Sequence, residues 1–178
     1  MAAANTDDLR AARAEVIREH MESENRHDFD ATIATFDHPR YELVATGQVF
    51  DGEAEVRKYF ANSRAAFPDQ RNELISLRHA DDAVIVEIDL LGTHAGTFLG
   101  FAPTGREFRC RMAAIFEFNG DRITCERVYY DSATILKQLG LLGARPTGPP
   151  NASAIEGPTI ERPAAVAVDA IERGGAAS

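Results

Sequence analysis

The chain contains few of the residues that mark several common classes of protein. It has no tryptophan, and only two cysteines, Cys110 and Cys125, in 178 residues. Two cysteines cannot form the disulfide framework of a small secreted domain, so a reducing cytoplasm is the simplest expectation. The sequence also lacks clustered ligands at metal-binding spacing and glycine-rich loops that bind phosphate. We therefore expect no metal and no cofactor.

Positive charge is scarce as well. The chain carries 19 lysines and arginines against 28 aspartates and glutamates, a formal charge of −9. Nucleic acids and anionic membranes attract clustered basic residues, so neither is expected as a partner. No apolar run approaches the roughly 20 residues that cross a bilayer. The N-terminus lacks the basic start and apolar centre of a secretion signal. Hydrophobic residues nevertheless make up 44% of the chain, enough for one domain core.

The first part of the chain has helical periodicity. Apolar residues recur on one side of 7–26, a stripe that includes His20, and a short second helix is predicted near 28–36. A third helix is predicted over 53–67, where Asp51 is placed to cap the first turn and Pro68 follows the last.

After residue 70 the apolar period changes from 3.6 to 2, which is typical of strands. Two hairpins and a final short helix that begins at Asp131 or Ser132 complete the pattern. Helices followed by an antiparallel meander indicate an α+β domain over 1–142. From Gly143 the composition becomes rich in proline, alanine and glycine, which predicts a flexible tail over 143–178.

The inner face of the sheet can be identified on the strand 106–118. Its odd positions carry charges, so its even positions are predicted to be buried; they are Phe108, Cys110, Met112, Ala114, Phe116 and Phe118. The parity of the preceding strand brings His94 to the same inner side, unless Gly92 hosts a bulge.

The last strand, "ITCERVYYD", is ambiguous because either Glu126 or Arg127 could point inward. If the preceding turn has three residues, Glu126 lies opposite Ala114 and faces the inside; a two-residue turn reverses this. The hairpin alone leaves both orientations open.

Three stretches of the chain resemble a known family. "HPRY", "GTHAGTFLGFAPTGREF" and "FNGDRITCERVYYDSATILKQLG" are similar to the SnoaL-like polyketide cyclases of the nuclear-transport-factor-2-like superfold, over roughly residues 7–142. The resemblance implies a curved antiparallel sheet wrapped around helices as a cone, whose open end binds a small hydrophobic molecule. It also implies a homodimer through the outer sheet face, with Ile123, Cys125 and Tyr129 as contact candidates. Glu126 then faces the pocket.

The same resemblance removes the family's usual catalytic pair. Aligned without gaps, the catalytic aspartate of the family falls at Val128 and its histidine at Ala114, and neither residue can carry a proton. Glu126, one inward step before Val128, has taken over this role, or the domain is not an enzyme.

Two functions follow from these observations. The first is a cofactor-free enzyme that cyclises, isomerises or hydrates a polyketide- or steroid-like carbonyl compound. Glu126 would be the base, and His94 or Tyr130 would stabilise the enolate; the expected lining residues are Tyr41, Met112, Ala114, Phe116, Val128 and Cys110. The second is a binding module without turnover. In that case Glu126 only pairs with an arginine or a tyrosine hydroxyl, and His94 only ties the loop that follows it.

Overall fold

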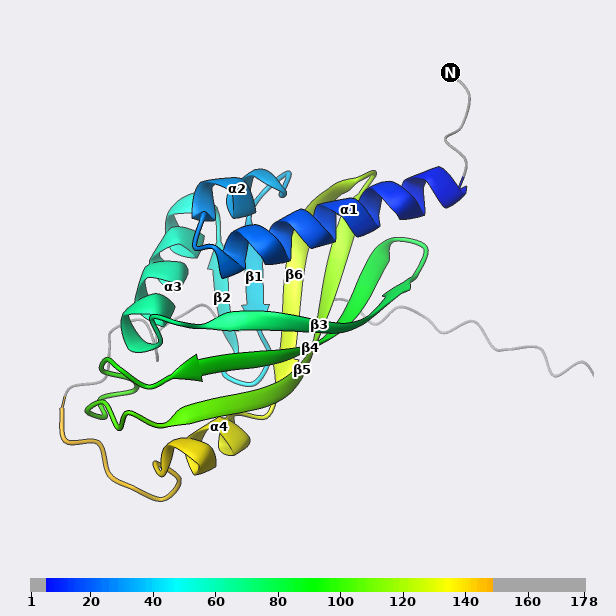
Figure 1. The fold of residues 1–178 in the computed structure, drawn as a ribbon. Coiled ribbons are helices and arrows are strands. Elements are labelled where there is room, and N and C mark those ends of the chain that lie inside the picture. The colour runs from blue at the N-terminus through cyan, green and yellow to red at the C-terminus, as the bar shows by residue number, and fades with distance from the viewer. Residues whose placement is uncertain (1–5, 149–178) are drawn as a thin grey trace, which may run out of the picture.

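The computed structural model of the protein describes residues 6–148. It contains four helices, α1 (Thr6–Asn25), α2 (Phe29–Ala34), α3 (Glu53–Ala66) and α4 (Ser132–Leu139). It also contains six strands, β1 (Arg40–Leu43), β2 (Gln48–Asp51), β3 (Arg71–His79), β4 (Ala83–Thr93), β5 (Glu107–Asn119) and β6 (Arg122–Tyr130). Figure 1 shows α1, α2 and α3 together on one side of a single sheet, with α4 at its far end.

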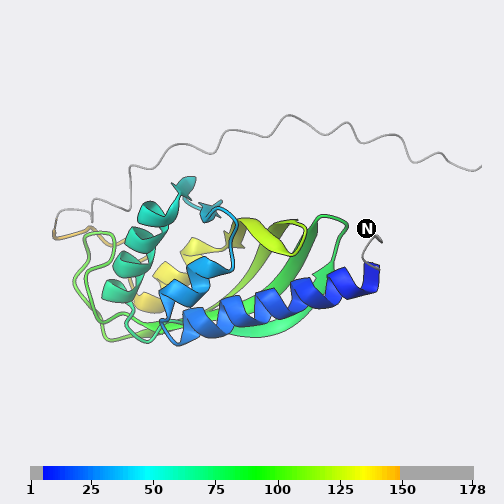
Figure 2. The ribbon, with the colours of Figure 1, turned by 90° about the horizontal axis from the view of Figure 1, so that it is seen from above.

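The sheet has the order β2-β1-β6-β5-β4-β3. Neighbouring strands of the sheet are antiparallel, except that β1 and β6 run parallel. This parallel pair joins the short β1–β2 hairpin to the edge of β6. The predicted α+β fold, with N-terminal helices on a curved sheet, is confirmed. The sheet itself is mixed, whereas a purely antiparallel sheet was expected. Seen from above, the strands curve beneath α1 to α3 (Figure 2).

The core fills the space between these helices and the sheet. All even positions of β5 are buried, as their alternation predicted. A large apolar cluster joins Ile17 and Met21 of α1 to the inner residues of β4, β5 and β6. A smaller cluster beneath α4 holds Phe67, Phe108 and Leu139. The cone therefore has its main core at the α1 end and a second apolar patch at the α4 end.

The β5–β6 hairpin decides the turn length that the sequence left open, and it contains a bulge that the sequence did not indicate. Asn119 pairs with Arg122, so the turn has two residues and not three. Thr124 is the extra residue of a β-bulge, since Phe118 pairs with Ile123 but Glu117 pairs with Cys125. The bulge reverses the parity a second time, and Glu126 faces inward opposite Phe116.

The structure also tests three smaller expectations. Asp51 does not cap α3: Gly52 occupies the N-cap position and no side chain bonds there, because Asp51 is held by Arg40 and His38 on the surface. No bulge interrupts β4 at Gly92, which pairs regularly with Phe108. Asp131 does cap α4, where its carboxylate accepts from the Ala133 backbone N–H.

The predicted tail begins at Gly143, and most of it, 149–178, lies outside the described residues. Within the described part of the chain, every helix is too short or too polar to cross a membrane.

Candidate active site

A cavity of about 260 Å³ lies between the concave face of the sheet and α3. Its wall is mainly apolar, with Leu43, Leu90, Met112 and Val128 from the sheet. Phe98 and Leu99 of the β4–β5 loop, together with Ile135 and Leu136 of α4, complete it. The volume is slightly below the range of about 300–1,000 Å³ that is typical of ligand sites. A compact hydrophobic molecule is the ligand that fits this space.

Glu126 is the acid in the deep wall of this cavity. Only 5% of the residue is exposed, and it lies beside Tyr41, its partner in the parallel β1–β6 pair. Its Oε2 atom is 3.3 Å from Nε2 of His20, which projects from α1. The contact is close but not aligned as a hydrogen bond, so Oε2 has no hydrogen-bond partner among the described residues. This oxygen is buried against His20, while the residue as a whole lines the cavity.

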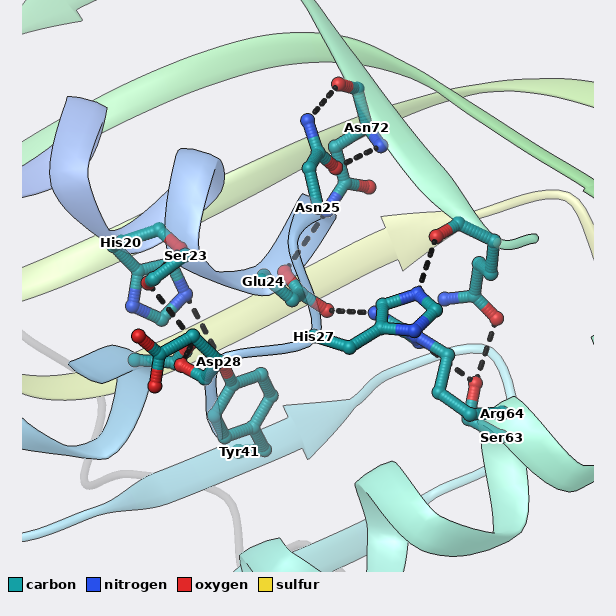
Figure 3. Close-up of polar contacts among 12 residues, drawn as sticks. His20, Ser23, Glu24, Asn25, His27, Asp28, Tyr41, Ser63, Arg64 and Asn72 are labelled. Atoms are coloured by element: carbon teal, nitrogen blue, oxygen red, sulfur yellow. Dashed lines mark hydrogen bonds and ion pairs between the residues drawn. The ribbon is translucent and has the colours of Figure 1, made fainter. Parts of the chain in front are cut away.

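His20 is fixed by bonds on both sides of its ring. Its Nδ1 lies 2.9 Å from the Thr35 hydroxyl, which itself donates to the Thr32 carbonyl over 2.6 Å. Because the Thr35 hydrogen is used in that bond, Nδ1–H is the donor to Thr35 Oγ1. Nε2 then faces the Tyr41 hydroxyl at 3.0 Å, and Figure 3 shows the two rings meeting there.

This contact places the imidazole against the Glu126 carboxyl group. With Nδ1 protonated, a neutral His20 would point the lone pair of Nε2 at an ionised carboxylate oxygen, which is repulsive. A protonated Glu126 carboxyl group removes this repulsion. Burial raises the pKa of Glu126 above its ordinary value near 4.5, and His20 offsets part of this rise. Burial and the charge of Glu126 also raise the pKa of Tyr41, so its hydroxyl keeps its proton.

A second polar group lies on another part of the cavity wall. Glu24 of α1 accepts from Arg64 Nη2 of α3 at 3.1 Å and from Asn72 Nδ2 of β3 at 2.9 Å. Ser63 of α3 donates to Gln70 beside them. Figure 3 shows these side chains converging from three elements. Glu24, Asn72, Ser63 and Gln70 all line the cavity.

The residues predicted for the site fall into two sets. Four of them line the cavity, namely Glu126, Tyr41, Met112 and Val128, and Tyr130 joins them at the end of β6. Three do not: Ala114 and Phe116 are packed in the main core, and Cys110 lies in the cluster beneath α4. The inward parity was correct for these three, but helices α1 and α4 cover that part of the sheet with side chains.

His94 also lies away from the cavity lining. It is fully buried against Phe67 and Phe98, and its Nδ1 accepts from the Thr104 backbone N–H. Burial lowers its pKa. The structure thus places His94 against the loop that follows it and not beside Glu126. This is the alternative considered above, in which His94 only holds that loop.

Sequence reasoning missed the partners of Glu126. His20 was noted only as part of an apolar helical stripe, and Glu24, Arg64 and Asn72 were not singled out. A signal did exist, because His20 and Glu24 are four residues apart and so share one face of α1. Two ionisable residues on the inner face of a helix are costly unless they have partners.

A cone of mixed sheet and helices, with an acid in an apolar cavity, defines a class of small pocket proteins. The chain belongs to one family of this class: the model of the SnoaL-like polyketide cyclase family matches residues 14–139.

Solved structures share this fold. AclR from Streptomyces galilaeus, provisionally assigned as a hydroxylase, is 23% identical with a TM-score of 0.65, over 74% of this chain and 87% of its own. IdmH from Streptomyces antibioticus, provisionally assigned as a polyketide cyclase, is 23% identical with a TM-score of 0.64, over 72% and 98%. A protein from Xanthomonas campestris with the same provisional assignment is 18% identical with a TM-score of 0.67, over 74% and 98%. No protein of curated function matches the sequence.

Proposed function

We propose that the protein is a cofactor-free enzyme that moves a proton on a small hydrophobic carbonyl compound of polyketide type. The observation that carries this proposal is the position of Glu126, a buried carboxyl group that lines an apolar cavity and lies beside His20. Keeping such a group out of water costs free energy, and a raised pKa suits a general base that works near neutral pH.

In the proposed reaction Glu126 takes a proton from the carbon next to the ligand carbonyl. The C–H bond breaks, its electron pair forms the enolate, and the proton stays on the carboxyl group beside His20. In ring closure, the enolate carbon attacks a second carbonyl carbon of the same molecule, the C=O π electrons move to the oxygen, and the resulting alkoxide takes the proton from Glu126. In isomerisation, the enolate takes the proton back at another carbon. The same acid–base group serves both outcomes.

Tyr130 is the proposed donor to the enolate oxygen. It lies on the inward row of β6 with Glu126 and Val128, and it lines the cavity. Burial raises its pKa, so the hydroxyl stays protonated, and it makes no hydrogen bond within residues 6–148. The Tyr41 hydroxyl, in contrast, is already bonded to His20. A free donor at the cavity wall stabilises negative charge as it develops.

The test is hydrogen–deuterium exchange at the α-carbon of α-tetralone, a bicyclic ketone, followed by proton NMR in heavy water. Glu126→Gln should slow this exchange by about 10²–10⁴-fold, the usual contribution of a general base, and leave the dissociation constant of the ketone nearly unchanged. The matched control is Glu107→Gln, because Glu107 is exposed on the outer face of β5. An exchange rate that is the same in the Glu126 variant and the wild type would exclude the proposed base.

A binding module remains the second candidate, because Val128 and Ala114 stand where the resemblance implies the catalytic pair of the family. It predicts that ketones bind to the cavity in the wild type and exchange no faster than in buffer. The cysteines are free and buried, which fits a reducing compartment for either function.

A further inference from the structure

The polar cluster Glu24–Arg64–Asn72 is a second feature of the cavity that the proposed proton transfer does not use. Its three side chains come from α1, α3 and β3, and each residue is 9% exposed or less. Arg64 and Asn72 each donate to one oxygen of the Glu24 carboxylate. The carboxylate is thereby held in one orientation at the cavity wall (Figure 3).

The cluster has hydrogen-bonding capacity left over. A carboxylate offers about four lone-pair sites, and two are used by Arg64 and Asn72. Asn72 Oδ1 and Arg64 Nε are buried and have no hydrogen-bond partner among residues 6–148. Buried polar atoms are nearly always satisfied in folded proteins, so each exception calls for a reason. A ligand group that bonds to this wall would supply one.

The chemistry of the wall selects the kind of ligand group. Its unused atoms at the cavity lining are acceptors, namely the remaining lone pairs of Glu24 and Oδ1 of Asn72; the donor Arg64 Nε belongs to a residue that does not line the cavity. Arg64 is already paired with Glu24, and Ser63 already donates to Gln70. A ligand carboxylate would meet the charge of Glu24 without a free cation to balance it. A hydroxyl group, which donates a proton and carries no charge, is the group that fits.

The two polar parts of the cavity are placed for one ligand to reach both. His20, which contacts Glu126, and Glu24 are four residues apart on α1, so their positions differ by about 6 Å along the helix axis. Both Glu126 and Glu24 line the same compact cavity. A ligand of two or three fused rings covers this separation.

We infer that Glu24 and Asn72 bind a hydroxyl group of the substrate, and that the site therefore selects a hydroxylated ketone over a carboxylated or wholly apolar one. This inference rests on the proposed function for the orientation of the ligand, with its ketone at Glu126 and its hydroxyl at the Glu24 wall.

The test compares the binding of α-tetralone with that of its phenolic derivatives, each hydroxylated at one position of the aromatic ring, by isothermal titration calorimetry. At least one phenolic isomer should bind the wild type about tenfold more tightly than α-tetralone, the effect of one net hydrogen bond. In Asn72→Ala, and in the double variant Glu24→Leu with Arg64→Met, this ratio should fall to about one. The double variant removes both charges and so leaves neither of them buried alone.

Two controls separate this inference from the proposed function. Glu22→Gln, an exposed residue of the same helix, should keep the tenfold preference. Glu126→Gln should also keep it while losing α-carbon exchange. The hydroxyl site is wrong if no phenolic isomer binds, or if none binds more tightly than α-tetralone. It is also wrong if Asn72→Ala and the double variant keep the preference. Either result would leave Glu126 free to be the base. If the preference follows the cluster but exchange does not depend on Glu126, the hydroxyl site stands and the proposed base is wrong.

Discussion

At the scale of single residues, the site depends on a carboxyl group and an imidazole that lie in contact inside the core. Glu126 could be singled out from sequence because it is the one acid among the even positions of the last strand. Its partner could not, because the contact joins α1 to β6 across 106 positions of the chain. Helical periodicity places His20 on the inner face of α1, but it does not say which strand lies beneath it.

Glu126 should titrate at a higher pH than an ordinary glutamate. Burial raises its pKa from the usual value near 4.5, and His20 counteracts the rise because an imidazolium favours the carboxylate. The protonated-carboxyl band of Glu126, identified by infrared difference spectroscopy against Glu126→Gln, should therefore persist above pH 4.5. In His20→Asn the band should persist to a still higher pH.

The control for this titration is His38→Asn, since His38 is largely exposed on the surface. It should leave the Glu126 band unchanged. A raised folded pKa also means that the protonated form favours folding, so this contribution to stability is present at low pH and is lost as the pH rises through the folded value. A band that disappears at the ordinary value, or is insensitive to His20, would contradict the raised pKa of Glu126 and its dependence on His20.

At the scale of elements, the inward orientation of Glu126 on β6 agrees with the resemblance, whereas the hairpin sequence had left it open. Of the two turns considered, the structure has the two-residue one, and Thr124 forms a bulge. The two-residue turn alone would point Glu126 outward, and the bulge reverses the parity again. Alternation specifies which face of a strand is buried, but it does not reveal where an extra residue is inserted. The resemblance to a family supplied the orientation that local patterns left open.

The β4–β5 loop is held against α3 at Gly96, and this contact should tolerate no side chain. A Cβ at Gly96 would lie 1.9 Å from the Ala65 carbonyl oxygen, a backbone atom of α3 that cannot rotate away as a side chain can. The Gly96 and Ala95 N–H groups both donate to the Ala66 carbonyl. Gly96→Ala should therefore destabilise the protein by about 1–3 kcal/mol, as overpacking does, in urea unfolding followed by circular dichroism.

The matched control is Gly148→Ala, where the nearest atom lies 3.5 Å from an added Cβ. It should change the unfolding midpoint little. The loop beyond Gly96 carries Phe98 and Leu99 to the cavity, so Gly96→Ala should also weaken ketone binding. Unfolding midpoints that are equal for the two variants would show that the loop adjusts to the added methyl group.

At the scale of the whole molecule, the sheet separates two surfaces of different chemistry. The concave face carries the cavity, and the outer face carries ion pairs such as Arg111–Asp89 and Arg127–Glu42. Of the contact candidates on that face, Ile123 is instead packed in the main core and Cys125 is buried, because the bulge at Thr124 alters the parity between them. Tyr129 alone is exposed.

An apolar patch nevertheless remains at the centre of the outer face. Tyr129 pairs with Ala113, and Ile85 pairs with Ile115 on the neighbouring strands, while Ile85 and Tyr129 are 39% and 42% exposed. Charges of both signs surround this patch. A surface with an apolar centre and a rim of both signs can complement a second copy of itself about a two-fold axis. We therefore propose that a homodimer forms through this face.

If the protein dimerises there, a charge at the centre of the patch should separate the subunits. Tyr129→Glu would bury two like charges close to the two-fold axis, so the dimer dissociation constant should rise at least about tenfold, measured by sedimentation velocity over a dilution series. Leu142→Glu is the matched control, because Leu142 is also exposed but lies beyond α4 and off the outer face. It should sediment as the wild type does. Because Tyr129 points away from the cavity, neither variant should change α-carbon exchange in the monomer. A wild type that is monomeric at every concentration, or a Tyr129 variant that stays dimeric, would show that the apolar patch is not a contact between two copies.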